Sequence, residues 1–347
     1  MRIVMNRYSF FLLLCCLPLI GRQSVFAQYN DEVIKRGSTS GSRITIRCQI
    51  VDYDGRHLTA RTRTGEKLLR IDSPDVIAIR TAQSQPHKIG IKAFDKGRTR
   101  ESEVQLTEAI KVEPRAWMRR QILTLLVRCA LKRNDRLTAS TRFRLLFESD
   151  SQTPHINLIP LLWTGATADG EARAAAITWL KDPEPVARLL GASLLLLDSG
   201  HSEAALKVLT ELARTPGARI RQLASWQRRR LRIRSRDVTD FDLGRWQSQI
   251  EKLEPSLRAG PLFILGQGYL VRQDFDMAAA TLLKVPLVHD SEHWVSAQSL
   301  LDAGRALARI GMRGEAAKLY SEVLDRYSYS AVAVEAQEEL DQLAAKK

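Results

Sequence analysis

The sequence lacks the short motifs that mark common enzymes and has few cysteines. It contains no Gly-rich phosphate loop followed by Lys and Ser or Thr, no G-x-S-x-G elbow, no H-E-x-x-H helix and no dinucleotide fingerprint. Only 4 of the 347 residues are cysteine, too few for a disulfide framework. We therefore predict no catalytic residues, no small-molecule cofactor and no metal site. An enzyme with a site of another type is the least favoured alternative.

The chain also lacks an apolar run long enough to span a membrane, which needs roughly 20 residues. The run from Tyr8 to Ile20 is shorter, follows two arginines and precedes Val25 and Ala27, which stand where a signal peptidase reads small residues. We predict that residues 1–27 are a signal peptide cleaved after Ala27. The protein is then exported, periplasmic or secreted, with no stable transmembrane span after cleavage.

Cleavage would leave two cysteines, Cys48 and Cys129, which fall in different predicted modules. Two buried thiols are the favoured interpretation, because cysteine is among the most buried residue types, and a bridge is the open alternative. Cys15 and Cys16 could indicate a lipoprotein. Leu14 disfavours this, because a lipobox needs a small residue there.

Acidic residues are outnumbered, with 39 Asp plus Glu against 53 Lys plus Arg and a net charge of +14. This excess favours an anionic partner, such as nucleic acid, acidic polysaccharide, anionic lipid or an acidic protein. Net charge alone does not choose among them. Aromatic residues are also scarce, at 6%, as in helical arrays with cores of Leu and Ala.

Two segments precede the helical part. Residues 28–41 are polar and aperiodic, which predicts a linker. Residues 42–82 alternate with period two, as at Ile44, Ile46 and Cys48, and contain the turn Asp54-Gly55, so we expect a small four-stranded β module. The module resembles an SH3-like or Sm-like barrel. Solvated strand faces are the favoured interpretation of its arginines, and anion binding is the alternative, for Arg47, Arg61 and Arg63.

Helical spacing begins near His87 and defines residues 83–347 as a helical repeat domain. Two hairpins between Leu262 and Tyr327 repeat the same order of small and large residues, with Gly266 and Ala278 matching Gly304 and Ala316. Such hairpins must stack on neighbours to bury enough apolar surface. Residues 154–180 are irregular. We expect specificity to reside in the middle of the chain, where the repeat pattern is weakest.

One further segment has the spacing of a tetratricopeptide (TPR) repeat, carried by Gly90, Ala93, Gly97, Ser102, Leu106, Ala109 and Pro114. The chain therefore resembles the TPR family. The resemblance implies a mainly α fold, a TPR-like α-solenoid of helical hairpins whose concave groove binds a protein or peptide. The whole arrangement also resembles exported proteins of planctomycete-type bacteria that combine a short β module with such repeats, a resemblance that implies no particular activity.

The densest charge is the run Arg228 to Arg236. If the run is helical, Arg228, Arg232 and Arg236 share one face, and guanidinium groups suit phosphate, sulfate and carboxylate. Arg228, Arg229, Arg232 and Arg236 are thus the candidate anion or partner site. A solvated or internally paired helix end is the favoured alternative.

Two other clusters have structural interpretations. Arg115, Arg119 and Arg120 near Trp117 follow the Pro that closes a repeat, so we interpret them as the start of a new helix. His289 and His293 could approach each other on a helix. A polar turn is favoured there, because two ligands without a third seldom hold zinc.

The leading hypothesis is an exported, non-enzymatic interaction or scaffold protein that binds a protein or peptide through a TPR-like groove. The alternative is a polyanion-binding protein, for nucleic acid or acidic polysaccharide, that uses the Arg-rich run.

Overall fold

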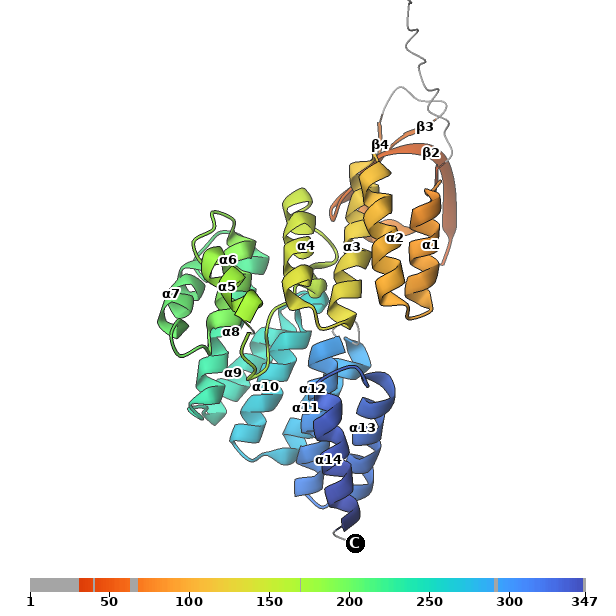
Figure 1. Cartoon of the computed structure of the whole chain (residues 1–347). Helices are drawn as coiled ribbons and strands as arrows, with labels where there is room; N and C mark the ends of the chain where they lie inside the picture. Colours follow the sequence, from red (N-terminus) through yellow and green to blue (C-terminus); the bar gives the residue numbers. More distant parts are fainter. Residues whose placement is uncertain (1–30, 40, 63–67, 169, 290–292, 346–347) are drawn as a thin grey trace, which may run out of the picture.

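The computed structural model describes residues 31–345 except 40, 63–67, 169 and 290–292, so the predicted signal peptide lies outside the described residues. In the described part, fourteen α-helices follow a five-stranded antiparallel sheet. The sheet and the first three helices lie at one end of the molecule and the C-terminus at the other (Figure 1). This architecture confirms the mainly α fold class and the helical hairpins.

The sheet has the order β4-β3-β2-β1-β5, with a 3-10 turn at Ser73–Asp75 between its two edge strands. Its strands are β1 (Asp31–Arg36), β2 (Arg43–Tyr53), β3 (His57–Thr62), β4 (Leu68–Asp72) and β5 (Val76–Arg80). The expectation of four strands after a linker at 28–41 was wrong for Asp31–Arg36. This strand pairs with both β2 and β5, and the buried Asp31 carboxylate accepts the Ile50 N–H at 2.8 Å.

The sheet and the first helices share one apolar core. The inward residues Val33, Cys48 and Leu58 pack in one cluster with Leu106 and Met118 from the helices α2 (Thr99–Val112) and α3 (Ala116–Lys132). Cys48 and Cys129 are both free and buried in this cluster, which confirms the interpretation as buried thiols. Burial raises the pKa of both, that of Cys48 to about 11.

The arginines around Trp117 join the helices to the sheet. Arg115 pairs with Glu113, with Nε at 2.6 Å from Oε1, and donates to Thr81 Oγ1 at 2.8 Å. Arg120 pairs with Asp52 and donates to the Tyr53 carbonyl at 2.9 Å. Helix α3 begins directly after Arg115, so these arginines lie at the start of a new helix, as predicted. Trp117 is 1% exposed, and the arginines beside it also hold the sheet against α3.

Consecutive helices pack as hairpins along most of the chain, and the array curves until α12 contacts α3. The other helices are α1 (Gln85–Asp95), α4 (Arg136–Ser149), α5 (Gly170–Trp179), α6 (Pro185–Leu195), α7 (Ser202–Leu212), α8 (Ala218–Arg234), α9 (Asp240–Glu251), α10 (Ala259–Val271), α11 (Phe275–Val288), α12 (His293–Arg309), α13 (Arg313–Arg326) and α14 (Val332–Ala345). None of the described helices combines the length and the apolarity needed to cross a membrane.

In the C-terminal hairpins, the paired helices approach each other closely at glycine residues. A side chain at Gly266 would collide with Leu282 of α11, and one at Gly304 would collide with the Tyr320 ring of α13. Ala278 and Ala316 are fully buried at the corresponding positions of the second helices. The matched small residues of the sequence therefore lie where the paired helices approach most closely.

The regular packing is interrupted twice. Between α4 and α5, the chain runs through a short 3-10 turn, Ile156–Leu158, and then buries an irregular stretch that ends at Trp163. Further on, α10 contacts both α8 and α9. Both interruptions fall in the middle of the array.

Candidate functional site

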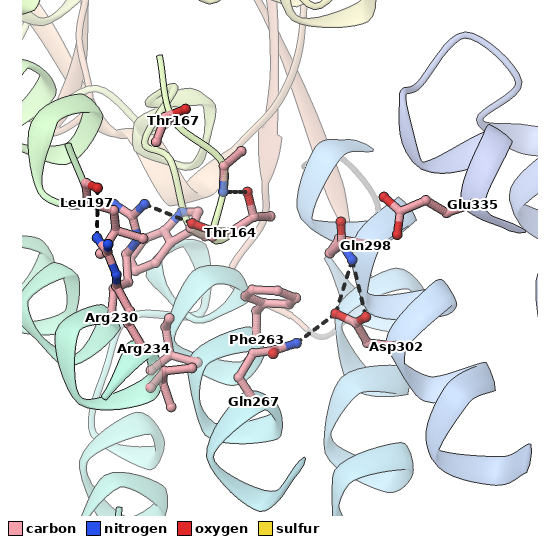
Figure 2. A pocket seen from close by; sticks show the side chains of 15 residues that line it. Thr164, Thr167, Leu197, Arg230, Arg234, Phe263, Gln267, Gln298, Asp302 and Glu335 are labelled. Atoms are coloured by element: carbon pink, nitrogen blue, oxygen red, sulfur yellow. Dashed lines mark hydrogen bonds between the residues drawn. The ribbon is translucent and has the colours of Figure 1, made fainter. Parts of the chain in front are cut away.

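A cavity of about 670 Å³ opens at these interruptions. Its walls come from the segment Trp163–Thr167, from α8, α10 and α12, and from Glu335 of α14 (Figure 2). Known ligand pockets span roughly 300–1,000 Å³, so this cavity has the size of a binding site.

Two small features place the irregular segment at the cavity. Gly260 in the first turn of α10 leaves space for Trp163, because any Cβ there would overlap the indole ring. The Ser193 hydroxyl of α6 accepts the Leu162 N–H at 2.8 Å and lies 3.1 Å from Gln227 Oε1, to which it donates. The buried segment is thereby held on both sides, with Thr164 to Thr167 along the cavity rim.

Arg230 and Arg234 of α8 form one wall of the cavity. Arg230 is 2% exposed and donates to the carbonyl oxygens of Ser193 and Thr164, each at 2.8 Å, and to Gln227 Oε1 at 3.0 Å. Arg234 is exposed and donates to the Leu197 carbonyl at 2.8 Å. Among the described residues, these hydrogen-bond acceptors are all neutral, so the wall keeps its positive charge.

Burial is the main influence on the Arg230 side chain. It lowers the pKa of this guanidinium to about 9, and the positive charge of Arg136 lowers it further. The group still carries a proton at neutral pH, where it is a buried cation without a carboxylate partner in the described chain. Such a charge is costly unless an anion compensates it.

Asp302 of α12 and Glu335 of α14 lie on the other side of the cavity (Figure 2). Asp302 is 8% exposed and accepts from Gln267 Nε2 at 2.7 Å and from Gln298 Nε2 at 3.2 Å. Burial raises its pKa to about 6, although the nearby Arg305 opposes the shift.

The guanidinium group of Arg305 forms ion pairs with three carboxylates on this side of the cavity. Arg305 lies 2.9 Å from Glu335, 2.7 Å from Glu339 and 3.5 Å from Asp302. Within the described residues these three acids have no other ion-pair partner, so this wall has an excess of negative charge once Asp302 is ionised. The two walls therefore carry opposite, incompletely compensated charges.

The floor between the walls is largely apolar. Phe263 and Ile264 of α10 and Ile233 of α8 line it, beside Trp163 and Leu197. Gln267 and Gln298 use their amide nitrogens on Asp302, which leaves their side-chain oxygens as acceptors. The cavity can thus bury apolar groups, accept hydrogen bonds and distinguish charge.

The four arginines predicted as a site differ in their surroundings. Helix α8 ends at Arg234, and Arg236 follows in a left-handed conformation with φ of 55°. The run is therefore not helical as far as Arg236, and this residue does not share a helical face with Arg228 and Arg232. Arg228 and Arg236 are exposed.

The other two arginines are engaged by the protein itself. Arg229 lies over the Trp226 ring, 3.7 Å from its centroid, and donates to Gln249, while burial lowers its pKa to about 10. Arg232 pairs with Asp242 of α9 at 2.6 Å and with Asp237 at 3.5 Å. Hydrogen bonds from Thr239 and then from Arg232 hold the pKa of Asp242 well below its usual range.

The cavity is lined by other arginines of the same run, Arg230 and Arg234. Leu223, Gln227, Arg230 and Arg234 recur at spacings of three and four, which places them on one face of a helix. Because Leu223 is buried, this spacing already assigns Arg230 to the core side of α8. Arg230 and Arg234 were not among the predicted site residues, although this spacing could have identified them.

The other candidate residues that the structure describes lie outside the cavity lining. Arg47 pairs with Glu32 at 3.3 Å, Arg61 is exposed, and Arg63 lies outside the described residues. His289 caps the end of α11, whereas residues 290–292 and the His293 side chain are not described. The described part of the chain contains no group of three side chains placed to hold a metal ion.

The protein is thus an array of helical hairpins with an N-terminal antiparallel sheet. A cavity of ligand size lies where the regular packing of the array is interrupted. Comparison with protein-family models and with curated protein sequences finds no match for this chain.

Proposed function

We propose that the protein is an exported, non-enzymatic interaction protein that binds a segment of a partner protein in the cavity between α8, α10 and α12. The observation that carries this proposal is the cavity itself, with its apolar floor and its incompletely compensated polar walls. Apolar side chains of a partner would be buried on Phe263 and Ile264. The side-chain oxygens of Gln267 and Gln298 would accept its backbone N–H groups.

The export part rests on the sequence of residues 1–27 and is tested by the mass of the secreted chain, which should begin at Gln28.

The test is a selection from a library of short synthetic peptides against the full mature chain. Thr167→Trp enlarges an exposed side chain at the cavity rim, and Thr141→Trp makes the same change on an exposed part of α4. We expect selected peptides to bind the unmodified chain and Thr141→Trp equally, and Thr167→Trp at least about tenfold more weakly. A failure to select any peptide, or equal binding to all three chains, would refute the proposal.

The alternative, polyanion binding through the Arg-rich run, has support only from Arg228 and Arg236, which are exposed. Arg229 and Arg232 have partners within the chain. Polyanion retention distinguishes this alternative and is treated in the Discussion.

A further inference from the structure

The charges of the cavity are separated rather than mixed. Arg230 and Arg234 lie on the α8 side, and Asp302 and Glu335 lie on the side of α12 and α14, with Phe263 and Gln267 of α10 between them (Figure 2). No ion pair within the described chain joins the two sides. A ligand that spans the cavity therefore meets positive charge at one end and negative charge at the other.

The cationic side has unused capacity to bind an anion. A guanidinium group has five N–H donors, and Arg234 uses only its Nη1 nitrogen, on the Leu197 carbonyl, among the described residues. Arg230 donates through both Nη atoms to neutral acceptors, and its buried Nε has no hydrogen-bond partner among the described residues. A carboxylate beside Arg234 would form charge-assisted hydrogen bonds and also lower the energy of the buried Arg230 charge.

The anionic side has the reverse imbalance. Arg305 alone is shared by Asp302, Glu335 and Glu339 within the described chain. Glu335 is exposed at the rim and holds Arg305 through one oxygen at 2.9 Å. Its carboxylate can accept further hydrogen bonds, so an ammonium or guanidinium group would fit beside it.

The exposed rim of the cavity favours a segment of a protein chain over a small free ligand. Gly165, Ala166 and Thr167 are exposed on one side, and Arg234 and Glu335 are exposed at the two charged ends. An extended chain can enter and leave across such a rim while only its side chains reach the walls. The two charges would then come from side chains rather than from chain ends.

We infer that the cavity takes an extended segment of a partner protein with an acidic side chain at Arg230 and Arg234 and a basic side chain at Asp302 and Glu335. Apolar residues between the two charges cover Phe263. This inference rests on the proposed function, because it specifies the segment that the same cavity would bind.

The experiment uses acetylated and amidated synthetic peptides in which Glu and Lys flank apolar spacers of increasing length. Each has two neutral analogues, with Gln for Glu and norleucine for Lys. Arg234→Gln and Glu335→Gln remove one exposed charge from each wall. Arg228→Gln on α8 and Glu338→Gln on α14 are matched controls, since both side chains are exposed and outside the cavity lining.

We expect the best doubly charged peptide to bind the unmodified chain about tenfold more tightly than either neutral analogue. Arg234→Gln should abolish the preference for Glu over Gln and keep the preference for Lys. Glu335→Gln should do the reverse, and the two control variants should change neither preference. Melting curves of the four variants check that the fold is kept.

Two results overturn the inference alone. One is binding that Thr167→Trp blocks but that does not depend on the peptide charges. The other is tighter binding of uncharged peptides with free termini, which would assign the walls to chain ends. Absence of binding by every peptide, or binding that is unaffected by Thr167→Trp, overturns the proposed function as well.

Discussion

In the C-terminal hairpins, α10 to α13, the paired helices meet through glycine and a large side chain, Gly266 against Leu282 and Gly304 against Tyr320. In the middle of the array, α6 and α8 meet the irregular segment through the buried polar groups of Ser193, Gln227 and Arg230. The first kind of contact depends on shape alone. The second depends on hydrogen bonds between buried polar groups.

This difference distinguishes the structural framework of the array from its candidate binding site. Repeated apolar contacts can be stacked, because each hairpin presents the same surface to the next. A polar contact between unlike segments fits at one place only, and here it leaves a buried cation beside a cavity. The following predictions test whether the two regions differ in this way, from the largest expected effect to the smallest.

Overpacking should have its largest effect in the C-terminal hairpins. Ala316 is fully buried in α13, so Ala316→Trp should lower the free energy of unfolding by about 3 kcal/mol. Lys318→Trp, on the exposed side of the same helix, should change it by less than about 0.5 kcal/mol. Denaturant titration of the three chains measures both effects, and equal midpoints for all three would show that Ala316 does not lie in a tight seam.

Two buried serines should respond differently to the same substitution. Ser193→Ala leaves the buried Leu162 N–H without its acceptor and removes one of the two donors to Gln227 Oε1, which should cost about 1–3 kcal/mol. Ser299, buried in α12, has no hydrogen-bond partner for its hydroxyl among the described residues, so Ser299→Ala should be neutral or stabilising. Thermal and denaturant unfolding compare the pair. Equal losses would remove the distinction between the two regions.

The sequence predicted those parts of the fold that depend on residues near one another. Hydrophobic periodicity identified the helices and placed Gly304 opposite the helix that contains Ala316, because both features repeat over a few turns. Strand β1 was missed because it has a single fully inward apolar residue, Val33, and its other buried side chain is the polar Asp31. Its pairing depends on β2 and β5, which no local pattern shows.

The position of the cavity could be predicted only in part from the sequence. The irregular stretch and the Arg-rich run were both assigned to the middle of the chain, and both contribute to the cavity. The partners that give Arg230 and Asp302 their properties are remote in sequence: the Thr164 carbonyl for Arg230, and Gln267 for Asp302. Helical spacing assigns Arg230 to the buried side of α8, but it cannot show that no carboxylate lies there.

The pH dependence of stability should distinguish a carboxylate of the cavity from one of the middle helices. Burial raises the pKa of Asp302 from 3.8 to about 6, so between these values the folded chain binds more protons than the unfolded chain. The Asp302 contribution to stability should therefore increase by about 1 kcal/mol as the pH falls from 7 to 5. Asp302→Asn should lack this increase in unfolding titrations at the two pH values.

Asp242 provides the opposite case. Its pKa is lowered by Thr239 and Arg232, so its contribution is present above the ordinary carboxylate pKa and is lost as the pH falls below it. Asp242→Asn should therefore remove stability at pH 7 and pH 5 alike, with little change between them. A difference between wild type and Asp302→Asn that is the same at pH 5 and pH 7 would contradict the assigned role of burial.

The smallest expected effect concerns the exposed arginines of the middle region. Arg228→Ala together with Arg236→Ala removes two of many surface cations, while the cavity charges at Arg230 and Arg234 stay in place. Retention on an immobilised polyanion should decrease slightly, and by the same amount as for Arg100→Ala with Arg214→Ala, an equal loss of exposed charge elsewhere. If the first pair contacts bound phosphate or sulfate directly, the salt dependence of binding should instead fall by about one ion per arginine, and only for that pair. Such a selective loss would favour the polyanion alternative, because screening of net charge cannot distinguish two pairs of equally exposed arginines.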